Sequence, residues 1–163
     1  MNSLLTSSLR NSAILLILIF MSALVSGQET DFSGKWKLNT SKSSLSYDFS
    51  LAPKQLNIVQ EENALSMERF TEMMGQSLNY TDKFTLDGKE CINEGMGGAD
   101  RKSVVTWGED KKSLIIKTKI PTDEYGEVEV TETLSVDEGT LTVKSLAVSG
   151  MGELYEIFVF DKE

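Results

Sequence analysis

Histidine is absent from the 163-residue sequence, and cysteine occurs once, as Cys91. Without histidine the chain lacks the commonest metal ligand and the usual general base near neutral pH. A single cysteine cannot form an internal disulfide, so we interpret Cys91 as a small buried hydrophobe. The sequence has only two prolines and no helical hydrophobic pattern of useful length. These absences argue against histidine-based chemistry and against a disulfide-stabilised or helical fold.

The N-terminus has the order of a secretory signal peptide. Arg10 is the only charged residue before Glu29, and the nine residues 13–21 (AILLILIFM) are all apolar. So short a run cannot span a bilayer, which needs about twenty apolar residues, and small residues follow it. We therefore expect residues 1–27 to be a cleaved signal peptide and residues 28–163 to form one periplasmic or secreted domain. We expect no stable membrane insertion after cleavage; an uncleaved N-terminal anchor is the alternative.

Positive charge is scarce in the expected mature chain. Removal of residues 1–27 takes away Arg10 and leaves 15 Lys and Arg residues against 25 Asp and Glu residues, a formal net charge of −10. Such a chain repels nucleic acid and anionic membrane surfaces. The acidic residues are scattered along the sequence, which is typical of a solvated exterior. We therefore expect no nucleic-acid partner.

Short alternating segments separated by turn residues make up most of the sequence. The segment 32–39 places small or apolar residues on one face at every second position, which is the period of a half-buried strand: Phe32, Gly34, Trp36 and Leu38. Segment 77–86 ends at Asp87-Gly88, a dipeptide typical of hairpin turns. Regular short strands with hairpin-length links predict an all-β fold. We expect a single antiparallel up-and-down barrel of roughly 8–10 strands, each paired with its sequence neighbour.

The first strand segment carries a resemblance to a known family. The motif Gly34-x-Trp36 in FSGKWKLNTSKS, with LDGKE (86–90) and TETLSVDEGTLTV (131–143), resembles the lipocalin-like calycin superfamily, in particular small exported bacterial domains. The resemblance implies a barrel in which Trp36 closes the floor, Gly34 leaves room beside it, and a small molecule is bound inside. The alternative is a generic antiparallel β fold that uses Trp36 as a core residue.

The sequence departs from the fatty-acid-binding members of that superfamily. Their last strand carries an Arg-x-Tyr that holds the ligand carboxylate, whereas the corresponding stretch here is Phe158-Val159-Phe160. Only Arg69 and Arg101 remain in the mature chain to pair with a carboxylate. The loop of about fourteen residues after the first strand is too short for the helix pair of those proteins, and lipocalin disulfides are absent. We therefore do not expect a fatty acid held by its carboxylate.

Strand alternation assigns residues to the interior of the expected barrel. Two inward rows each carry one charge among apolar neighbours, Arg69 in one and Glu132 in the other. A barrel of this size can hold a small ligand, so these two residues are candidate polar contacts. The alternative is that each lies at the rim or that the two pair, because unpaired buried charge is costly. The candidate cavity residues are Met67, Arg69, Tyr80, Phe84, Ile116, Val130, Glu132 and Phe158.

The function expected from these features is binding of a small, mostly apolar molecule inside the barrel. No serine lies in a convincing setting beside a base, no pair of carboxylates stands out, and the methionines lack ligand spacing. We therefore expect no enzymatic activity, no cofactor and no metal site. The alternative function is that of a filled barrel acting as a non-enzymatic interaction or envelope-associated structural module.

Overall fold

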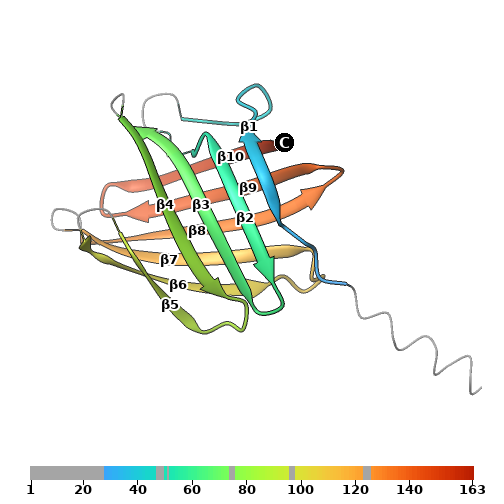
Figure 1. Ribbon diagram of the computed structural model, residues 1–163. Helices are drawn as coiled ribbons and strands as arrows, with labels where there is room; N and C mark the ends of the chain where they lie inside the picture. The colour runs from blue at the N-terminus through green and yellow to red at the C-terminus, as the bar shows by residue number, and fades with distance from the viewer. Residues whose placement is uncertain (1–27, 47–49, 51, 74–75, 96–97, 123–125) are drawn as a thin grey trace, which may run out of the picture.

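The computed structural model describes residues 28–46, 50, 52–73, 76–95, 98–122 and 126–163. The expected signal peptide, residues 1–27, lies outside the described residues. Within them the chain forms one ten-stranded antiparallel sheet (Figure 1). Its strands are β1 (Gly34–Leu38), β2 (Gln55–Glu61), β3 (Ala64–Met73), β4 (Gln76–Thr85), β5 (Glu90–Glu94), β6 (Asp100–Trp107), β7 (Ser113–Thr122), β8 (Gly126–Asp137), β9 (Thr140–Ser149) and β10 (Gly152–Lys162).

The strand order is that of an up-and-down barrel whose first strand pairs with its last. Neighbours in the sheet follow the order β4-β3-β2-β1-β10-β9-β8-β7-β6-β5. In the ladder between β1 and β10, Trp36 lies opposite Lys162 and Leu38 lies opposite Phe160. The predicted all-β antiparallel barrel is confirmed, with ten strands that close almost completely.

The junction between β4 and β5 departs from the expected pairing of sequence neighbours. The Asp87-Gly88 turn is present, with Gly88 at a φ of 76°, but β4 and β5 are the two ends of the sheet and share no ladder. At this junction side chains of β5, in place of its backbone, form hydrogen bonds with the backbone of β4. Asn93 accepts from the Lys83 N–H at 2.8 Å and donates to the Lys83 carbonyl at 3.1 Å, and Cys91 Sγ accepts from the Thr85 N–H at 3.1 Å. The hairpin ladder expected at Asp87-Gly88 is therefore wrong, because side-chain hydrogen bonds link the two strands where a backbone ladder was expected.

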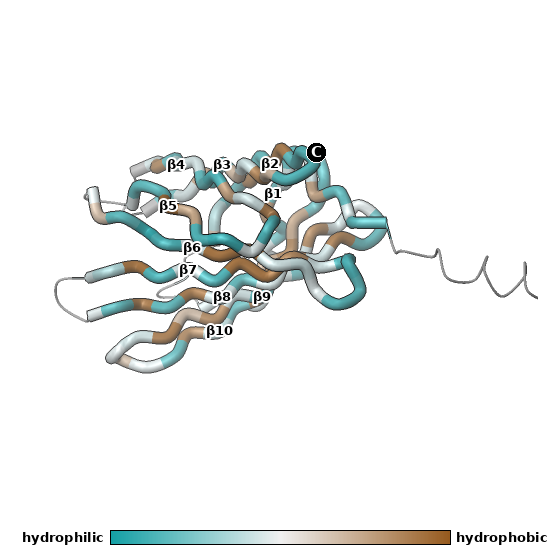
Figure 2. The backbone as a smooth tube through the Cα atoms, turned by 90° about the horizontal axis from the view of Figure 1, so that it is seen from below, coloured by the Kyte–Doolittle hydropathy of each residue, from teal (hydrophilic) through white to brown (hydrophobic). Residues whose placement is uncertain are grey.

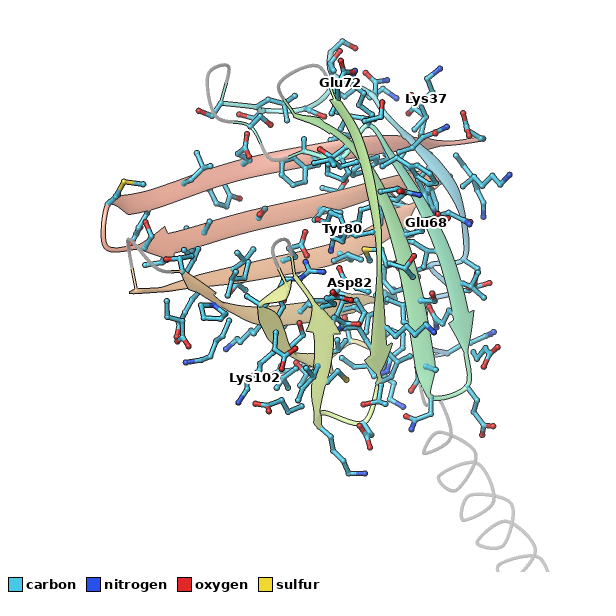
Figure 3. All side chains as sticks on the ribbon, turned by 60° about the vertical axis from the view of Figure 1, so that its left-hand side comes forward. Lys37, Glu68, Glu72, Tyr80, Asp82 and Lys102 are labelled. Atoms are coloured by element: carbon cyan, nitrogen blue, oxygen red, sulfur yellow. The ribbon has the colours of Figure 1, made fainter. Side chains whose placement is uncertain are left out.

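The barrel is flattened into two layers. Figure 1 shows β2, β3 and β4 running across the front of β7 to β10. Hydropathy alternates along the strands in Figure 2, as expected where one face of each strand is buried. Figure 3 shows Tyr80 and Asp82 between the layers, whereas Lys37 and Lys102 extend away from the barrel. The alternation read from the sequence thus separates an interior from a solvated exterior.

Aromatic residues fill the end of the barrel beside the first strand. Trp36 is fully buried, and its indole N–H donates to the carbonyl oxygen of Phe32 at 3.0 Å. Phe32 packs in turn against Trp107, with 6.2 Å between ring centroids. The ammonium of Lys162 lies 5.1 Å from the centroid of the Trp36 ring, a cation–π contact. Trp36 therefore contacts both the segment just before β1 and the tenth strand.

The described part of the chain contains no helix with the length and apolar character needed to cross a membrane.

Candidate functional site

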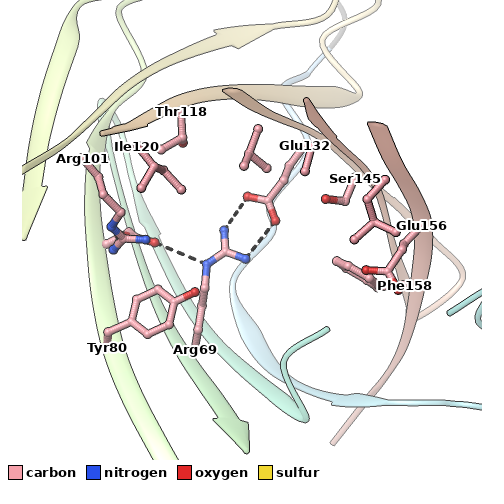
Figure 4. A pocket seen from close by; sticks show the side chains of 13 residues that line it. Arg69, Tyr80, Arg101, Thr118, Ile120, Glu132, Ser145, Glu156 and Phe158 are labelled. Atoms are coloured by element: carbon pink, nitrogen blue, oxygen red, sulfur yellow. Dashed lines mark hydrogen bonds and ion pairs between the residues drawn. The ribbon is translucent and has the colours of Figure 1, made fainter. Parts of the chain in front are cut away.

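A cavity of about 110 Å³ occupies the part of the barrel interior that the apolar core leaves unfilled (Figure 4). Its apolar wall comes from β7, β8, β9 and β10, and its charged residues come from β3, β4, β6, β8 and β10. The lining residues are Arg69, Tyr80, Asp82, Arg101, Thr118, Ile120, Val130, Glu132, Ser145, Ala147, Leu154, Glu156 and Phe158.

The boundary between the packed core and the cavity can be followed along single strands. On β8, Leu134 is fully buried in the core, whereas Glu132 and Val130 line the cavity. On β10, Phe160 belongs to the core, and Phe158 lies in the core cluster at the cavity wall. Because alternate residues of a strand face the same side, each strand passes from core to cavity in steps of two residues. The two zones therefore share one continuous interior.

A bidentate ion pair joins opposite sides of this interior. Arg69 on β3 donates to both carboxylate oxygens of Glu132 on β8, at 2.9 and 2.6 Å. Its Nε donates to Asp82 on β4 at 3.3 Å. Both side chains of the bidentate pair are about one-tenth exposed. The alternative in which Arg69 and Glu132 pair is thus the arrangement that the structure contains.

Arg101 extends the same network to β6. Its guanidinium forms an ion pair with the second oxygen of Asp82 and lies 4.7 Å from the centroid of the Tyr80 ring. Asp82 therefore bridges two guanidinium groups, one on each side. We refer to Arg69, Asp82, Arg101 and Glu132 as the interior ion network. It combines charge pairing with cation–π contact, so most of its donors have a defined partner.

Burial and charge pairing oppose each other at these groups. Burial raises the pKa of Asp82 above its usual value, although Arg69 and Arg101 act to lower it. Burial is the largest single effect on Arg69 and disfavours its charged guanidinium, but Glu132, Tyr80 and Asp82 together outweigh burial and raise the pKa of Arg69. Arg69 therefore remains a cation throughout the accessible pH range. The interior ion network therefore keeps charged groups in the buried interior of the barrel.

A third acidic residue, Glu156, lines the cavity from β10. It is 2% exposed, and its carboxylate accepts from the backbone N–H of Ser46 at 2.8 Å. In the sheet register Glu132 lies opposite Ser145, and Ser145 lies opposite Glu156. The three side chains therefore form a polar row across β8, β9 and β10. Apolar residues of the next row, Val130, Ala147 and Leu154, continue the wall.

The structure brings five of the eight candidate cavity residues to the cavity. These are Arg69, Tyr80, Val130, Glu132 and Phe158. Met67, Phe84 and Ile116 lie instead in the packed core, at 4% exposure or less. They have the expected inward parity, but alternation gives the face of a residue and not its depth along the barrel. Gly34 and Trp36 lie in the packed half, away from the cavity.

Asp82, Arg101 and Glu156 line the cavity but are not among the eight predicted cavity residues, although Arg101 is one of the two arginines named above as able to pair with a carboxylate. A sequence signal existed for the two carboxylates. Asp82 shares the parity of Tyr80 and Phe84, and Glu156 shares the parity of Phe158. Carrying alternation strictly through every charged position would have placed these carboxylates inside. Within the described ranges, no three Cys, Asp or Glu residues are arranged so that they could hold a metal ion.

Comparison with known proteins finds solved structures that resemble this one but no matching sequence family. No family model matches the chain, and no curated protein matches it. The zebrafish ileal bile acid-binding protein, solved in complex with cholic acid, is similar over 81% of this chain and 98% of its own, with a TM-score of 0.54 and 20% identity. The Manduca sexta fatty-acid-binding protein is similar over 80% of this chain and 99% of its own, with a TM-score of 0.48 and 16% identity. At 20% identity the zebrafish match shows the fold alone, an antiparallel up-and-down β-barrel.

Proposed function

We propose that this protein is exported and binds a small, mostly apolar molecule in the cavity of its barrel. The observation that carries the proposal is the cavity itself, in which an apolar wall faces a few fixed polar groups. The wall consists of Ile120, Val130, Ala147, Leu154 and Phe158. Small-molecule sites usually have this composition, with apolar surface for affinity and few polar groups for orientation. The same fold accommodates a small amphiphile in the zebrafish protein, which was solved with cholic acid.

The size of the cavity limits the size of the ligand. Ligand pockets usually measure about 300–1,000 Å³, whereas this cavity measures about 110 Å³. An engineered apolar cavity of about 150 Å³ binds benzene. The closest fit is therefore one small ring or a short alkyl chain, with any larger part of the ligand outside the cavity. Burial of such a group contributes about 25 cal/mol per Å² of apolar surface.

The proposal is tested by expressing the full precursor in an exporting cell and recording native mass spectra of the purified protein. We expect the mass of residues 28–163 with a bound small molecule that is lost on activation. Retention of residues 1–27 would contradict cleavage at the expected site. Protein that is bare on purification, and stays bare after soaking with a lipid extract and with short-chain amphiphiles, would contradict ligand binding.

Two phenylalanine substitutions on β9 give a matched control. Ala147 lines the cavity, so Ala147→Phe places a ring in the space that the ligand would occupy. The adjacent Val148 points outward and is 37% exposed, so Val148→Phe adds the same bulk outside the barrel. We expect the first variant to lose the bound molecule and the second to retain it. Equal retention by both would show that the molecule binds elsewhere.

A second candidate function, that of an interaction module, is favoured by the outer face of the β9–β10 hairpin. Tyr155 is 58% exposed, Met151 is 72% exposed and Val148 lies near them on β9. An exposed apolar cluster of this kind marks some protein contact sites. This candidate predicts that Val148→Phe or Tyr155→Ser alters association with a partner while Ala147→Phe does not. The β9 and β10 variants thus separate the two functions.

A further inference from the structure

We propose that the cavity selects an apolar molecule with a cationic amine head group over one with a carboxylate. This inference rests on the proposed function, binding in the barrel cavity, and adds the chemical class of the ligand. It is carried by the way the cavity's arginines are already paired and by the sum of the charges that line it.

Both guanidinium groups at the cavity already face carboxylates. Arg69 directs Nη1 and Nη2 to Glu132 and Nε to Asp82. Arg101 pairs with the other oxygen of Asp82 and also donates to the carbonyl oxygen of Glu94 at 3.4 Å. Nε of Arg101 is buried without a hydrogen-bond partner among the described residues, but an incoming carboxylate that engages Arg69 would have to displace Glu132 or Asp82 from these contacts. Such an exchange leaves a buried carboxylate behind, which is strongly unfavourable.

The charges that line the cavity sum to a negative value. Two guanidinium groups, Arg69 and Arg101, face three carboxylates, Asp82, Glu132 and Glu156, which gives 2 − 3 = −1 when all are ionised. A ligand carboxylate would bring a fourth negative charge into this poorly hydrated space, whereas an ammonium would neutralise the sum. Charges interact more strongly here than in water because the effective dielectric constant is lower. The interior ion network by itself is neutral, and the carboxylate of Glu156 gives the cavity the negative charge that favours a cation.

The polar row across β8, β9 and β10 offers acceptors in the right place for an amine. Glu132, Ser145 and Glu156 occupy adjacent register positions, and each has oxygen atoms that can accept from an ammonium with three donors. The apolar row beside it, Val130, Ala147 and Leu154, receives the alkyl part of the same molecule. An ammonium at the polar row and a short chain along the apolar row therefore match both walls.

The test compares three ligands of equal chain length: heptylamine, heptanol and heptanoate. Each is titrated into isotope-labelled protein at pH 7, and amide shifts of cavity residues report binding. We expect heptylamine to bind at least about tenfold more tightly than heptanoate, which corresponds to ~1.4 kcal/mol. Affinities for heptylamine and heptanoate within a factor of about three, or heptanoate as the tightest ligand, would overturn head-group selection while leaving cavity binding intact. Absence of binding by all three would overturn the proposed function itself.

Two variants on β8 that remove the same charge distinguish an effect of the cavity charge on ligand preference from an effect of the acidic surface. Glu132→Gln brings the cavity sum to zero and removes the bidentate carboxylate partner of Arg69, so heptanoate should gain affinity relative to heptylamine. Glu129→Gln makes the same change of charge on the outer face, where Glu129 pairs with Lys119, and should leave the ratio unchanged. Equal effects of both would assign the preference to long-range charge and overturn the proposal. If Glu132→Gln does not fold, Glu156→Gln makes the same change to the cavity sum.

Discussion

Arg69 on β3 and Glu132 on β8 form a two-fold hydrogen-bonded ion pair between strands that are separated by four others in the sheet order. The pair therefore crosses the interior and does not run along the sheet. It fixes the distance between the two layers at the level of the cavity. Its removal should affect stability and the shape of the cavity together.

Loss of one partner of this pair should cost more than loss of both. Arg69→Met or Glu132→Leu alone leaves a charge in a site where the side chains are about one-tenth exposed, and we expect each to destabilise the fold by roughly 3–5 kcal/mol. The double variant removes both charges, so its free energy of unfolding should recover most of that loss. Asp82 keeps Arg101 as its partner in every variant that lacks Arg69.

Urea denaturation of the four proteins of this double-mutant cycle measures the coupling. A coupling energy near zero would mean that the two charges are hydrated and independent. A double variant that is less stable than either single variant would mean that Met and Leu do not fill the vacated volume.

The side-chain link between β4 and β5 makes Asn93 a stability determinant. Asn93→Ala removes the partners of both backbone groups of Lys83, and we expect a loss of about 1–3 kcal/mol because two partly buried backbone groups would be left without these partners. Amide hydrogen exchange at Lys83 should be faster in the Asn93→Ala variant than in the wild type. The matched control is Asn79→Ala on β4, whose side chain is exposed. Equal effects of both substitutions would argue against a special role of the link.

The backbone of Gly34 gives a test of the Gly-x-Trp motif. Its φ is +150°, and an added Cβ would lie 2.9 Å from Cε of Lys162. Since that atom belongs to a flexible side chain, we attribute the expected loss in Gly34→Ala, about 1–3 kcal/mol, mainly to backbone strain. Thermal unfolding of Gly34→Ala is compared in wild-type and Lys162→Ala backgrounds. Full rescue by Lys162→Ala would identify the side-chain contact as the cause instead.

Asp87 should be unusually acidic although it is exposed. Hydrogen bonds from Lys89 and Thr85 lower the pKa of its carboxyl from 3.8 to about 2. Because the folded-state pKa is lowered, the ionised form stabilises the fold above about pH 4, and this contribution is lost as the pH falls through about 2. Carbon-detected NMR titration gives the pKa directly, and a midpoint near 3.8 would contradict the prediction. Asp87→Asn should flatten the stability profile between about pH 4 and pH 2.

The fold was accessible from the sequence because alternation and turn residues are local signals. Every second residue from Phe32 to Leu38 faces inward, and the same reading places Leu65, Met67 and Arg69 on one face. Depth along the barrel is set by strand stagger, which depends on all ten strands together. For this reason Met67 and Arg69 could not be assigned in advance to core and cavity.

The missing ladder between β4 and β5 could not be predicted from the sequence, for a different reason. Asp87-Gly88 specifies a reversal of the chain, and that reversal is present. Whether the flanking strands then pair depends on side chains several residues away, since Asn93 takes the place that a backbone partner would have. The interior ion network could be predicted only in part. Strand alternation places Asp82 inside the barrel, but its two arginine partners come from β3 and β6, and alternation does not indicate which strands face each other.

Pairing of β1 with β10 determines when the barrel can be completed. Trp36 and Lys162 are 162 − 36 = 126 residues apart, and Leu38 and Phe160 are 160 − 38 = 122 residues apart. Contacts of such long range form slowly compared with those of neighbouring hairpins. As the chain emerges from the ribosome, β2, β3 and β4 can pair early, while β1 still lacks its partner β10. The ladder that joins β1 to β10 can form only after β10 has emerged, so closure of the barrel follows the pairing of the earlier hairpins.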